Sequence, residues 1–153
     1  MPEIDLSLAP NRIVESLQLL VADLYSLTAL SHNLHWNIEG PNFDEYHSFF
    51  GDQYSENFNS SDVLAEQIRQ NQQFVKADLA LFKQLAGMPE ISAPFTGMQA
   101  FAVLQAAYEK YAKDLEDLKQ LSGKFNDLNT QQLVIDEQLR VSKNLWKIKS
   151  FQK

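Results

Sequence analysis

Apolar side chains recur every three or four residues over most of the chain, which is the spacing of helices that bury one face. The first such run follows Pro10, has Asn11 as its predicted N-terminal cap, and extends to about Trp36. Its apolar positions are Ile13, Leu17, Leu20, Leu24, Leu27, Leu30 and Leu34. A helix of roughly 25 residues spans about 38 Å, so this single element is long enough to cross a small domain.

A second helical pattern follows the break Glu39-Gly40-Pro41-Asn42, with Asn42 or Asp44 as its predicted start. Its apolar positions are largely aromatic and are expected to pack in the core: Phe43, Tyr46, Phe50, Tyr54, Phe58, Leu64 and Ile68. Gly51 interrupts the pattern at a cost of about 1 kcal/mol relative to Ala. A glycine in this position indicates either that another group comes close to the helix backbone or that a side chain has been lost.

The rest of the chain supplies one short and two long helical patterns. These are a short helix at 74–85, a loop at 89–97, a helix at 98–121 that Gly123 ends, and a last helix that starts at Asp127 or Asn129 and carries Leu133, Leu139, Leu145 and Ile148. The long connection between the second and third long helices allows the chain to cross over the bundle. The prediction is an all-α fold, a ferritin-like four-helix bundle with a short extra helix in the crossover between helices two and three.

Composition narrows the class of protein. With 153 residues, of which 44% are hydrophobic and 22% charged, the chain is expected to form one soluble domain over residues 1–153. The absence of cysteine excludes disulfides, thiolate metal sites and cysteine nucleophiles. The N-terminus has no signal-peptide pattern, and no uninterrupted apolar stretch predicts a membrane span. A cytoplasmic location is therefore expected.

The charge balance favours cations over nucleic acid as partners, since the net charge is −7 at pH 7 and the pI is about 4.9. One cationic cluster lies in the last helix and consists of Arg140, Lys143, Lys147, Lys149 and Lys153. The preferred interpretation is a solvated helix end whose cations complement the helix dipole. The alternative is a weak contact with DNA or another partner.

The candidate chemistry gathers around the break between the first two helices. His32, His35 and His47 are the three histidines of the chain. Asp62 and Glu66 follow on the second helix, four residues apart and therefore on one face. Imidazoles with spaced carboxylates suit a divalent first-row metal. The sequence therefore predicts a metal site.

One straight helix cannot bring these groups to one ion. Asp62 lies fifteen residues beyond His47, roughly 22 Å along the helix axis, whereas metal–ligand bonds are about 2 Å long. Three arrangements remain open: no shared site, a bent helix, or a site completed by another chain. A two-fold dimer with antiparallel second helices would bring His35 and His47 of one subunit to Asp62 and Glu66 of the other, twice.

Other enzyme classes lack their motifs in this chain. A P-loop, a dinucleotide fingerprint and an HExxH zinc motif are absent from the sequence. The Glu-x-x-His elements that build a di-iron site inside one bundle are absent as well. A site within a single bundle is thus disfavoured.

The chain resembles the Dps family, the mini-ferritins named as DNA-binding proteins from starved cells. The residues that carry the resemblance are His35-Trp36-Asn37, Gly40-Pro41-Asn42-Phe43, His47, Tyr54 and Asp62-x-x-Ala65-Glu66, with Asp127-Leu-Asn-Thr130 and Trp146 in the last helix. The spacings among the candidate ligands match the family pattern. The resemblance covers most of the chain, and the combined motif is specific, although His-Trp-Asn alone would be weak.

The resemblance implies a function and an assembly. The expected assembly is a hollow homo-oligomer, a dodecamer built from two-fold dimers, that oxidises Fe²⁺ preferably with hydrogen peroxide and stores ferric mineral, which protects against oxidative stress. The implied ferroxidase ligands are His35 and His47 with Asp62 and Glu66 of the dimer mate. They would hold one or two iron ions, and zinc could occupy the site in vitro. Trp36 is implied as an electron donor that limits radical leakage.

Two departures from the family pattern bear on this site. Gly51 stands where the family has an Asp four residues after the second His, and Asp52 is turned by about 100° from that position. Gln67 stands where the family has an Arg. The second iron position is therefore expected to be weaker, or completed by water or by His32. The preferred alternative for His32 is a capping or hydrogen-bonding role near the helix end.

Two competing functions remain. One is a non-catalytic cage that holds zinc or a single iron, and the other is a nucleoid-binding protein that acts through the C-terminal lysines. DNA binding in the family is tied to a Lys-rich tail, but this N-terminus has Glu3 and Asp5, and no lysine precedes Lys76. DNA binding is therefore disfavoured. The oxidant, the pore residues (Asp127 is one candidate) and the mineral capacity stay open.

Overall fold

The structure is a computed structural model that describes residues 9–153, so the N-terminal Glu3 and Asp5 lie outside the described residues. This part of the chain forms five helices and no strand. They are α1 (Ala9–Asn37), α2 (Phe43–Gln70), α3 (Leu79–Ala86), α4 (Gly97–Lys124) and α5 (Leu128–Phe151). The predicted all-α bundle with a short helix in its crossover is confirmed.

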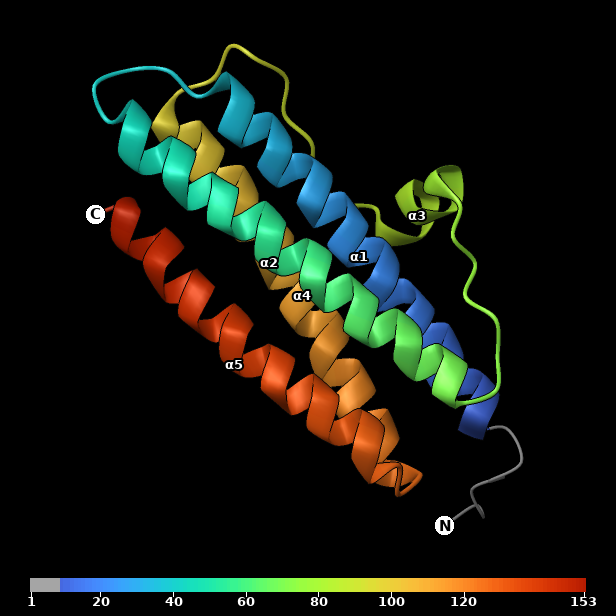
Figure 1. The fold of residues 1–153 in the computed structure, drawn as a ribbon. Helices are drawn as coiled ribbons and strands as arrows, with labels where there is room; N and C mark the ends of the chain where they lie inside the picture. Colours follow the sequence, from blue (N-terminus) through green and yellow to red (C-terminus); the bar gives the residue numbers. More distant parts are fainter. Residues whose placement is uncertain (1–8) are drawn as a thin grey trace.

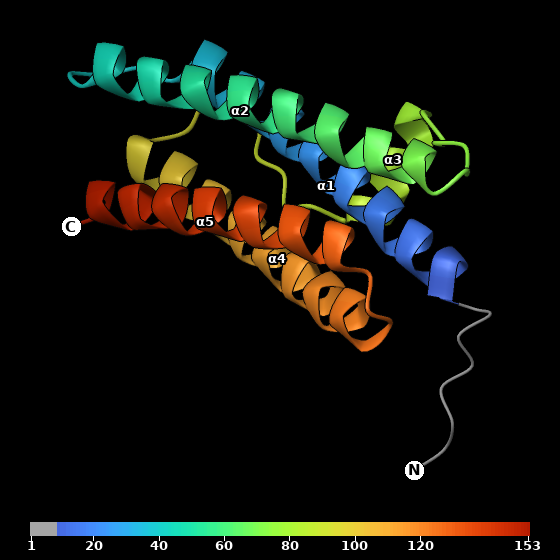
Figure 2. The ribbon, with the colours of Figure 1, turned by 60° about the horizontal axis from the view of Figure 1, so that its bottom comes forward.

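The four long helices form two layers, with α1 and α2 in one and α4 and α5 in the other (Figure 2). After α2 the chain passes through α3, which packs against α1, and returns along the bundle to begin α4 near the start of α2 (Figure 1). The helices of each layer run antiparallel. One face of the α1–α2 layer packs on α4 and α5, and its opposite face carries the candidate ligands.

The apolar pattern of the first helix correctly predicts which of its residues are buried in the core. All seven predicted apolar positions of this helix are buried, from Ile13 to Leu34. The aromatic stripe of α2 is different, because Phe50 is buried whereas Phe43 and Phe58 remain 39% and 56% exposed. Core packing was therefore the wrong prediction for these two rings, which lie at helix positions turned away from α4 and α5.

Several predicted boundaries are also corrected. Helix α1 begins at Ala9, so Pro10 lies in its first turn and Asn11 is helical, not a cap. The short helix begins at Leu79, because the Asp78 side chain accepts a hydrogen bond from the Leu81 N–H and caps it. Residues 73–78 are non-helical.

The end of α4 differs too. Gly123 lies inside the helix, which continues to Lys124, and Asn126 adopts the left-handed conformation at φ 57°. The predicted start of the last helix is confirmed, with Asp127 as its N-cap. Both carboxylate oxygens of Asp127 accept hydrogen bonds from Thr130, so a pore role would compete with this cap.

A polar layer joins α2, α4 and α5 inside the bundle. Arg140 pairs with Glu137 and, at 3.3 Å, with Glu56, and the Tyr111 hydroxyl donates to Glu137 at 2.8 Å. Burial and the neighbouring Glu137 carboxylate raise the pKa of Tyr111, so the phenol stays protonated as a donor. Arg140 is thus engaged inside the bundle and is not offered to a partner with the C-terminal lysines.

A second buried charge lies between α1 and α4. Asp23 is fully buried and accepts a hydrogen bond from Lys110 at 2.7 Å, while Lys110 also donates to Asp114 at 2.6 Å. Burial raises the pKa of Asp23 from 3.8 to about 8, and the bond from Lys110 only partly offsets this. The folded state therefore binds a proton that the unfolded state releases. The resulting stability is fully present below about pH 4 and is lost as the pH rises through about 8.

The packing of the bundle explains the apolar composition of α1. Residues Asn11–Asn37 are long and apolar enough to cross a membrane by length and composition alone. However, 61% of its most apolar window is buried inside the bundle. A core helix that packs against α2, α3 and α4 has the same composition.

Candidate metal site

His35 and His47 meet where α1 ends and α2 begins. Their rings stack with centroids 3.6 Å apart and planes inclined by 16°. His35 Nδ1 lies 2.6 Å from the backbone oxygen of His47, and His47 Nδ1 lies 2.7 Å from the backbone oxygen of His35. Each ring is therefore fixed by the other residue's main chain.

This reciprocal bonding sets the tautomer of both rings. A carbonyl oxygen can only accept, so each Nδ1 carries the proton and donates it. Both Nε2 atoms then have a free lone pair, which is the form of histidine that binds metals and which a backbone carbonyl commonly fixes. The bond from His47 also satisfies the His35 carbonyl, one of the four at the end of α1 that have no helical partner.

Gly51 makes room for this arrangement. A Cβ atom at this position would lie 3.2 Å from Cε1 and 3.3 Å from Nδ1 of His35. The prediction of a close approach at Gly51 is therefore confirmed, and the approaching group is the imidazole itself. An Asp in this position could not be added without moving the ring.

The stacked geometry limits what the pair can bind. An Nε2 lone pair lies in the plane of its own ring, and the two planes are nearly parallel. An ion in the plane of one ring lies out of the other plane by more than a metal–nitrogen bond of about 2 Å. As the rings stand, the pair offers one ligand each to two neighbouring ions.

Other rings extend the site along α1. His32 stacks on Trp36 at 4.8 Å and lies 4.1 Å from Tyr54, which also contacts His35 edge-on at 5.2 Å. Burial and the nearby His35 lower the pKa of His32. The Trp36 side chain is 69% exposed. Trp36 follows the candidate ligand His35 in sequence, but its ring stacks on His32.

Asp62 and Glu66 lie far from the imidazoles. Both are exposed on α2, which is one uninterrupted helix from Phe43 to Gln70. No group of three or more His, Asp or Glu side chains that could hold a metal ion forms among the described residues of a single chain. The bent-helix alternative is thereby excluded, and the carboxylates can share an ion with the imidazoles only through another subunit.

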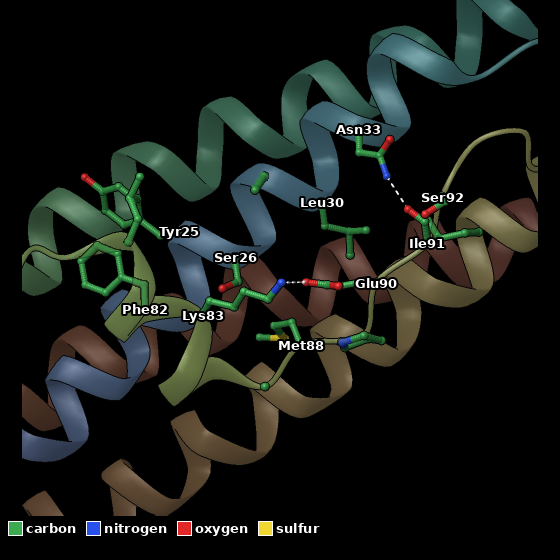
Figure 3. Close-up of a pocket in the computed structure, with 14 residues that line it drawn as sticks. Tyr25, Ser26, Leu30, Asn33, Phe82, Lys83, Met88, Glu90, Ile91 and Ser92 are labelled. Carbon is green, nitrogen blue, oxygen red and sulfur yellow. Dashed lines mark hydrogen bonds and ion pairs between the residues drawn. The ribbon is translucent and has the colours of Figure 1, made fainter.

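Two hollows flank the exposed face of α1. One, of about 470 Å³, lies beside Asp62 and has walls from Tyr25, Phe58, Ala65 and Phe82. The other, of about 710 Å³, lies between α1, α3 and the loop after it, where Asn33 bonds to the Ile91 carbonyl (Figure 3). The Lys83–Glu90 ion pair, with 3.2 Å between nitrogen and oxygen, crosses this larger hollow.

Comparisons with known proteins agree with this fold. The family model of the ferritin-like domain matches residues 14–152. A DNA protection during starvation protein 2 of Bacillus anthracis is 26% identical over 92% of this chain and 97% of its own length. The chain belongs to the Dps family of ferritin-like proteins.

Several solved structures superpose closely on this one. Antigen TpF1 of Treponema pallidum is 25% identical, with a TM-score of 0.91 over 100% of this chain and 97% of that structure. The Dps protein of Vibrio cholerae O1, described as one of the ferritin-like diiron-carboxylate proteins, has a TM-score of 0.91 at 22% identity over 95% and 91% of the two chains. The predicted family and fold class are confirmed.

Sequence reasoning missed several contacts that shape the site. The backbone oxygens of His35 and His47 leave no trace in a motif, because any residue supplies a carbonyl. The position of the Tyr54 ring against both His32 and His35 follows from helix packing. The aromatic spacing of α2 was a signal for it, although it could not tell which rings point to the site.

Proposed function

We propose that this Dps protein is a ferroxidase that oxidises Fe²⁺ with hydrogen peroxide at sites shared between two subunits and stores the ferric product in a cage. The observation that carries the proposal is the reciprocal bonding of His35 and His47, which leaves both Nε2 lone pairs free. Membership of a family of iron-storing, protective proteins supports the choice of iron.

The carboxylate ligands come from a second subunit in this proposal. A two-fold dimer with antiparallel α2 helices would carry the partner's Asp62 and Glu66 to the imidazole pair, and it would build two equivalent sites. Closed two-fold dimers can then assemble further, and the dodecameric cage is the proposed end state. The cytoplasm is its proposed location, where Fe²⁺ and peroxide would both be substrates.

The proposed reaction needs two ferrous ions for each peroxide. Each ion gives one electron, the O–O bond breaks, and two protons complete two water molecules while two ferric ions form. His35 and His47 would hold one ion each, and Glu66 of the partner, four residues from Asp62, is the proposed bridging group. The two carboxylates offset part of the charge of the ions, and the imidazoles would bind them as neutral ligands. His32 is a proposed additional ligand, and Trp36 a proposed electron donor.

A second candidate function is a cage that holds zinc or a single iron and turns over slowly. Gly51 favours it, because this residue supplies no carboxylate to the second ion. With four protein ligands for two ions, the second ion would depend on water molecules. DNA compaction is not proposed, since Arg140 of the C-terminal cluster is engaged within the bundle.

Stopped-flow absorbance of ferric product tests the proposal. Anaerobic Fe²⁺ followed by peroxide would be added to the wild type and to the Asp62→Ala/Glu66→Ala variant, both checked by size-exclusion chromatography. Fast oxidation in the wild type, lost in a variant that still assembles, is the expected result. Equal slow rates in two assembled proteins would contradict the ferroxidase and favour the slow metal-holding cage.

A further inference from the structure

A lysine and two carboxylates meet where the two layers of the bundle touch. Asp23 belongs to α1 and Lys110 to α4, so they come from different layers (Figure 2), and Asp114 lies one turn beyond Lys110. The Lys110 Nζ atom lies 2.7 Å from Asp23 Oδ1 and 2.6 Å from Asp114 Oδ2. The other oxygen of Asp23, Oδ2, is buried and has no hydrogen-bond partner among residues 9–153. A buried oxygen without a partner is uncommon in a folded protein and needs an explanation.

We infer that Lys110 and Asp23 condense to an amide bond between their side chains, with Asp114 as the group that takes the proton. The structure shows the three side chains before this bond forms. The bond would be a covalent link between the two layers in a chain that has no cysteine and so no disulfide. The inference is independent of the proposed iron chemistry, because none of the three residues belongs to the candidate metal site.

Burial makes Asp23 the electrophile. The residue is fully buried, which raises the pKa of its carboxyl to about 8, so the group is largely protonated at pH 7. A neutral carboxylic acid can be attacked by an amine, whereas the negative charge of a carboxylate opposes the attack. Because Oδ1 accepts the hydrogen bond from Lys110, the proton of the neutral acid belongs on Oδ2. The unpartnered Oδ2 is therefore the hydroxyl that would leave as water.

Asp114 supplies the proton acceptor that the lysine needs. Burial lowers the pKa of Lys110, but the hydrogen bonds to Asp114 and Asp23 outweigh it and raise this pKa, so the side chain is an ammonium at rest. Asp114 accepts a hydrogen bond from the ammonium and is 13% exposed, so it can take one proton and pass it to solvent. The free amine is then already held beside the Asp23 carboxyl, and no encounter in solution is needed.

The reaction balances without an oxidant or a cofactor. Lys110 gives one proton to Asp114, and its nitrogen forms a bond with Cγ of Asp23. The Cγ–Oδ2 bond breaks, and the departing hydroxyl takes a second proton from the nitrogen to form water. The products are one amide, one water and a protonated Asp114, with no change of oxidation state. The titration of Asp23 described above belongs to chains in which the amide has not formed.

Intact-mass spectrometry of the denatured full chain tests the inference. Wild-type protein followed over days at pH 7 should reach a mass about 18 Da below that of its sequence, the loss of one water. Lys110→Arg should keep the full mass, because a guanidinium does not give up its proton. Lys113→Arg is the matched control. Lys113 pairs with Asp117 at 2.8 Å across the same four-residue spacing, but both side chains are exposed, so this variant should lose water like the wild type.

Tryptic digestion locates the bond. The expected product is a branched peptide that joins residues 13–69 to residues 84–113 and is not cleaved after Lys110. Asp114→Asn should form it about 100-fold more slowly, as for loss of a general base; formation at the wild-type rate would refute the role given to Asp114. Wild-type protein that keeps its full mass would overturn the inference and leave a buried ion pair. A water loss that persists in Lys110→Arg would overturn it too, because an aspartate that cyclises onto its own backbone loses the same mass.

Discussion

Two inactive variants of this protein should restore each other's activity when they assemble together. The first variant, His35→Ala/His47→Ala, lacks the imidazoles and keeps the carboxylates. The second variant, Asp62→Ala/Glu66→Ala, keeps the imidazoles and lacks the carboxylates. Each variant alone has no complete site if every site takes its imidazoles from one subunit and its carboxylates from the other.

The size of the effect follows from two-fold symmetry. A mixed dimer has one site that lacks all four ligands and one site that retains all four. Random pairing of equal amounts makes about half of the dimers mixed, and each of these has one complete site of two. The mixture should therefore oxidise iron at about one quarter of the wild-type rate. A site built within one chain would give no activity in any mixture.

Co-expression with two different tags, followed by sequential purification on both, isolates assemblies that contain both variants. Their rate of peroxide-dependent iron oxidation would be compared with that of the wild type at the same protein concentration. The two variants purified separately and mixed without subunit exchange are the control, and they should remain inactive. Doubly tagged assemblies of normal size with no activity would refute the shared site.

Three further substitutions probe the packing beneath the site. Gly51→Ala should stabilise α2 by up to about 1 kcal/mol in urea unfolding. The same variant should weaken Co²⁺ binding by about 10-fold or more in a metal titration, because the new Cβ would displace the His35 ring. Unchanged Co²⁺ binding would contradict this prediction. In the wild type, the free energy of unfolding in urea should fall by a few kcal/mol between about pH 4 and 8 as Asp23 loses its proton. Asp23→Asn should remove most of this fall, and an unaltered pH profile of the unfolding free energy would count against the prediction. Arg140→Met should destabilise the fold by about 3–5 kcal/mol, since it leaves Glu137 buried without its cation, and a neutral effect would be a refutation.

The sequence predicted the fold because one strong periodicity repeats over each long helix. The seven apolar positions of α1 are all buried, since a helix at the centre of a bundle must bury its whole stripe. The errors fall where local signals compete. Phe74 was assigned to the short helix on its apolar character alone, but the Asp78 side chain caps that helix, which begins at Leu79, five residues after its expected start. Phe74 lies instead against the Arg69 guanidinium. Gly123 read as a stop, yet Asn126 supplies the left-handed residue instead.

The site was predictable to the extent that residue type and spacing decide it. The tight break between the first two helices predicts the histidine pair, and the helix rise gives the distance to Asp62. That distance excluded a shared ion on one straight helix, but the sequence left a bent helix, a second chain and no shared site open. The hydrogen bonds to the carbonyls of His35 and His47 could not be predicted, because backbone atoms have no sequence signature. The inward turn of Arg140 was missed for a related reason. Its partner Glu56 lies far away in sequence, and no local pattern joins α2 to α5.

The hydrogen bond from His47 to the end of α1 also determines which substitutions test metal binding separately from stability. This bond satisfies a helix carbonyl that otherwise has no partner, and the same bond fixes the imidazole for metal binding. Loss of His47 therefore removes a helix cap along with a ligand, so a lower activity in that variant has two causes. Asp62 and Glu66 are exposed in the isolated subunit, where solvent can compensate for their loss. The carboxylate variant consequently separates the shared site from the stability of the subunit, which the imidazole variant cannot do alone.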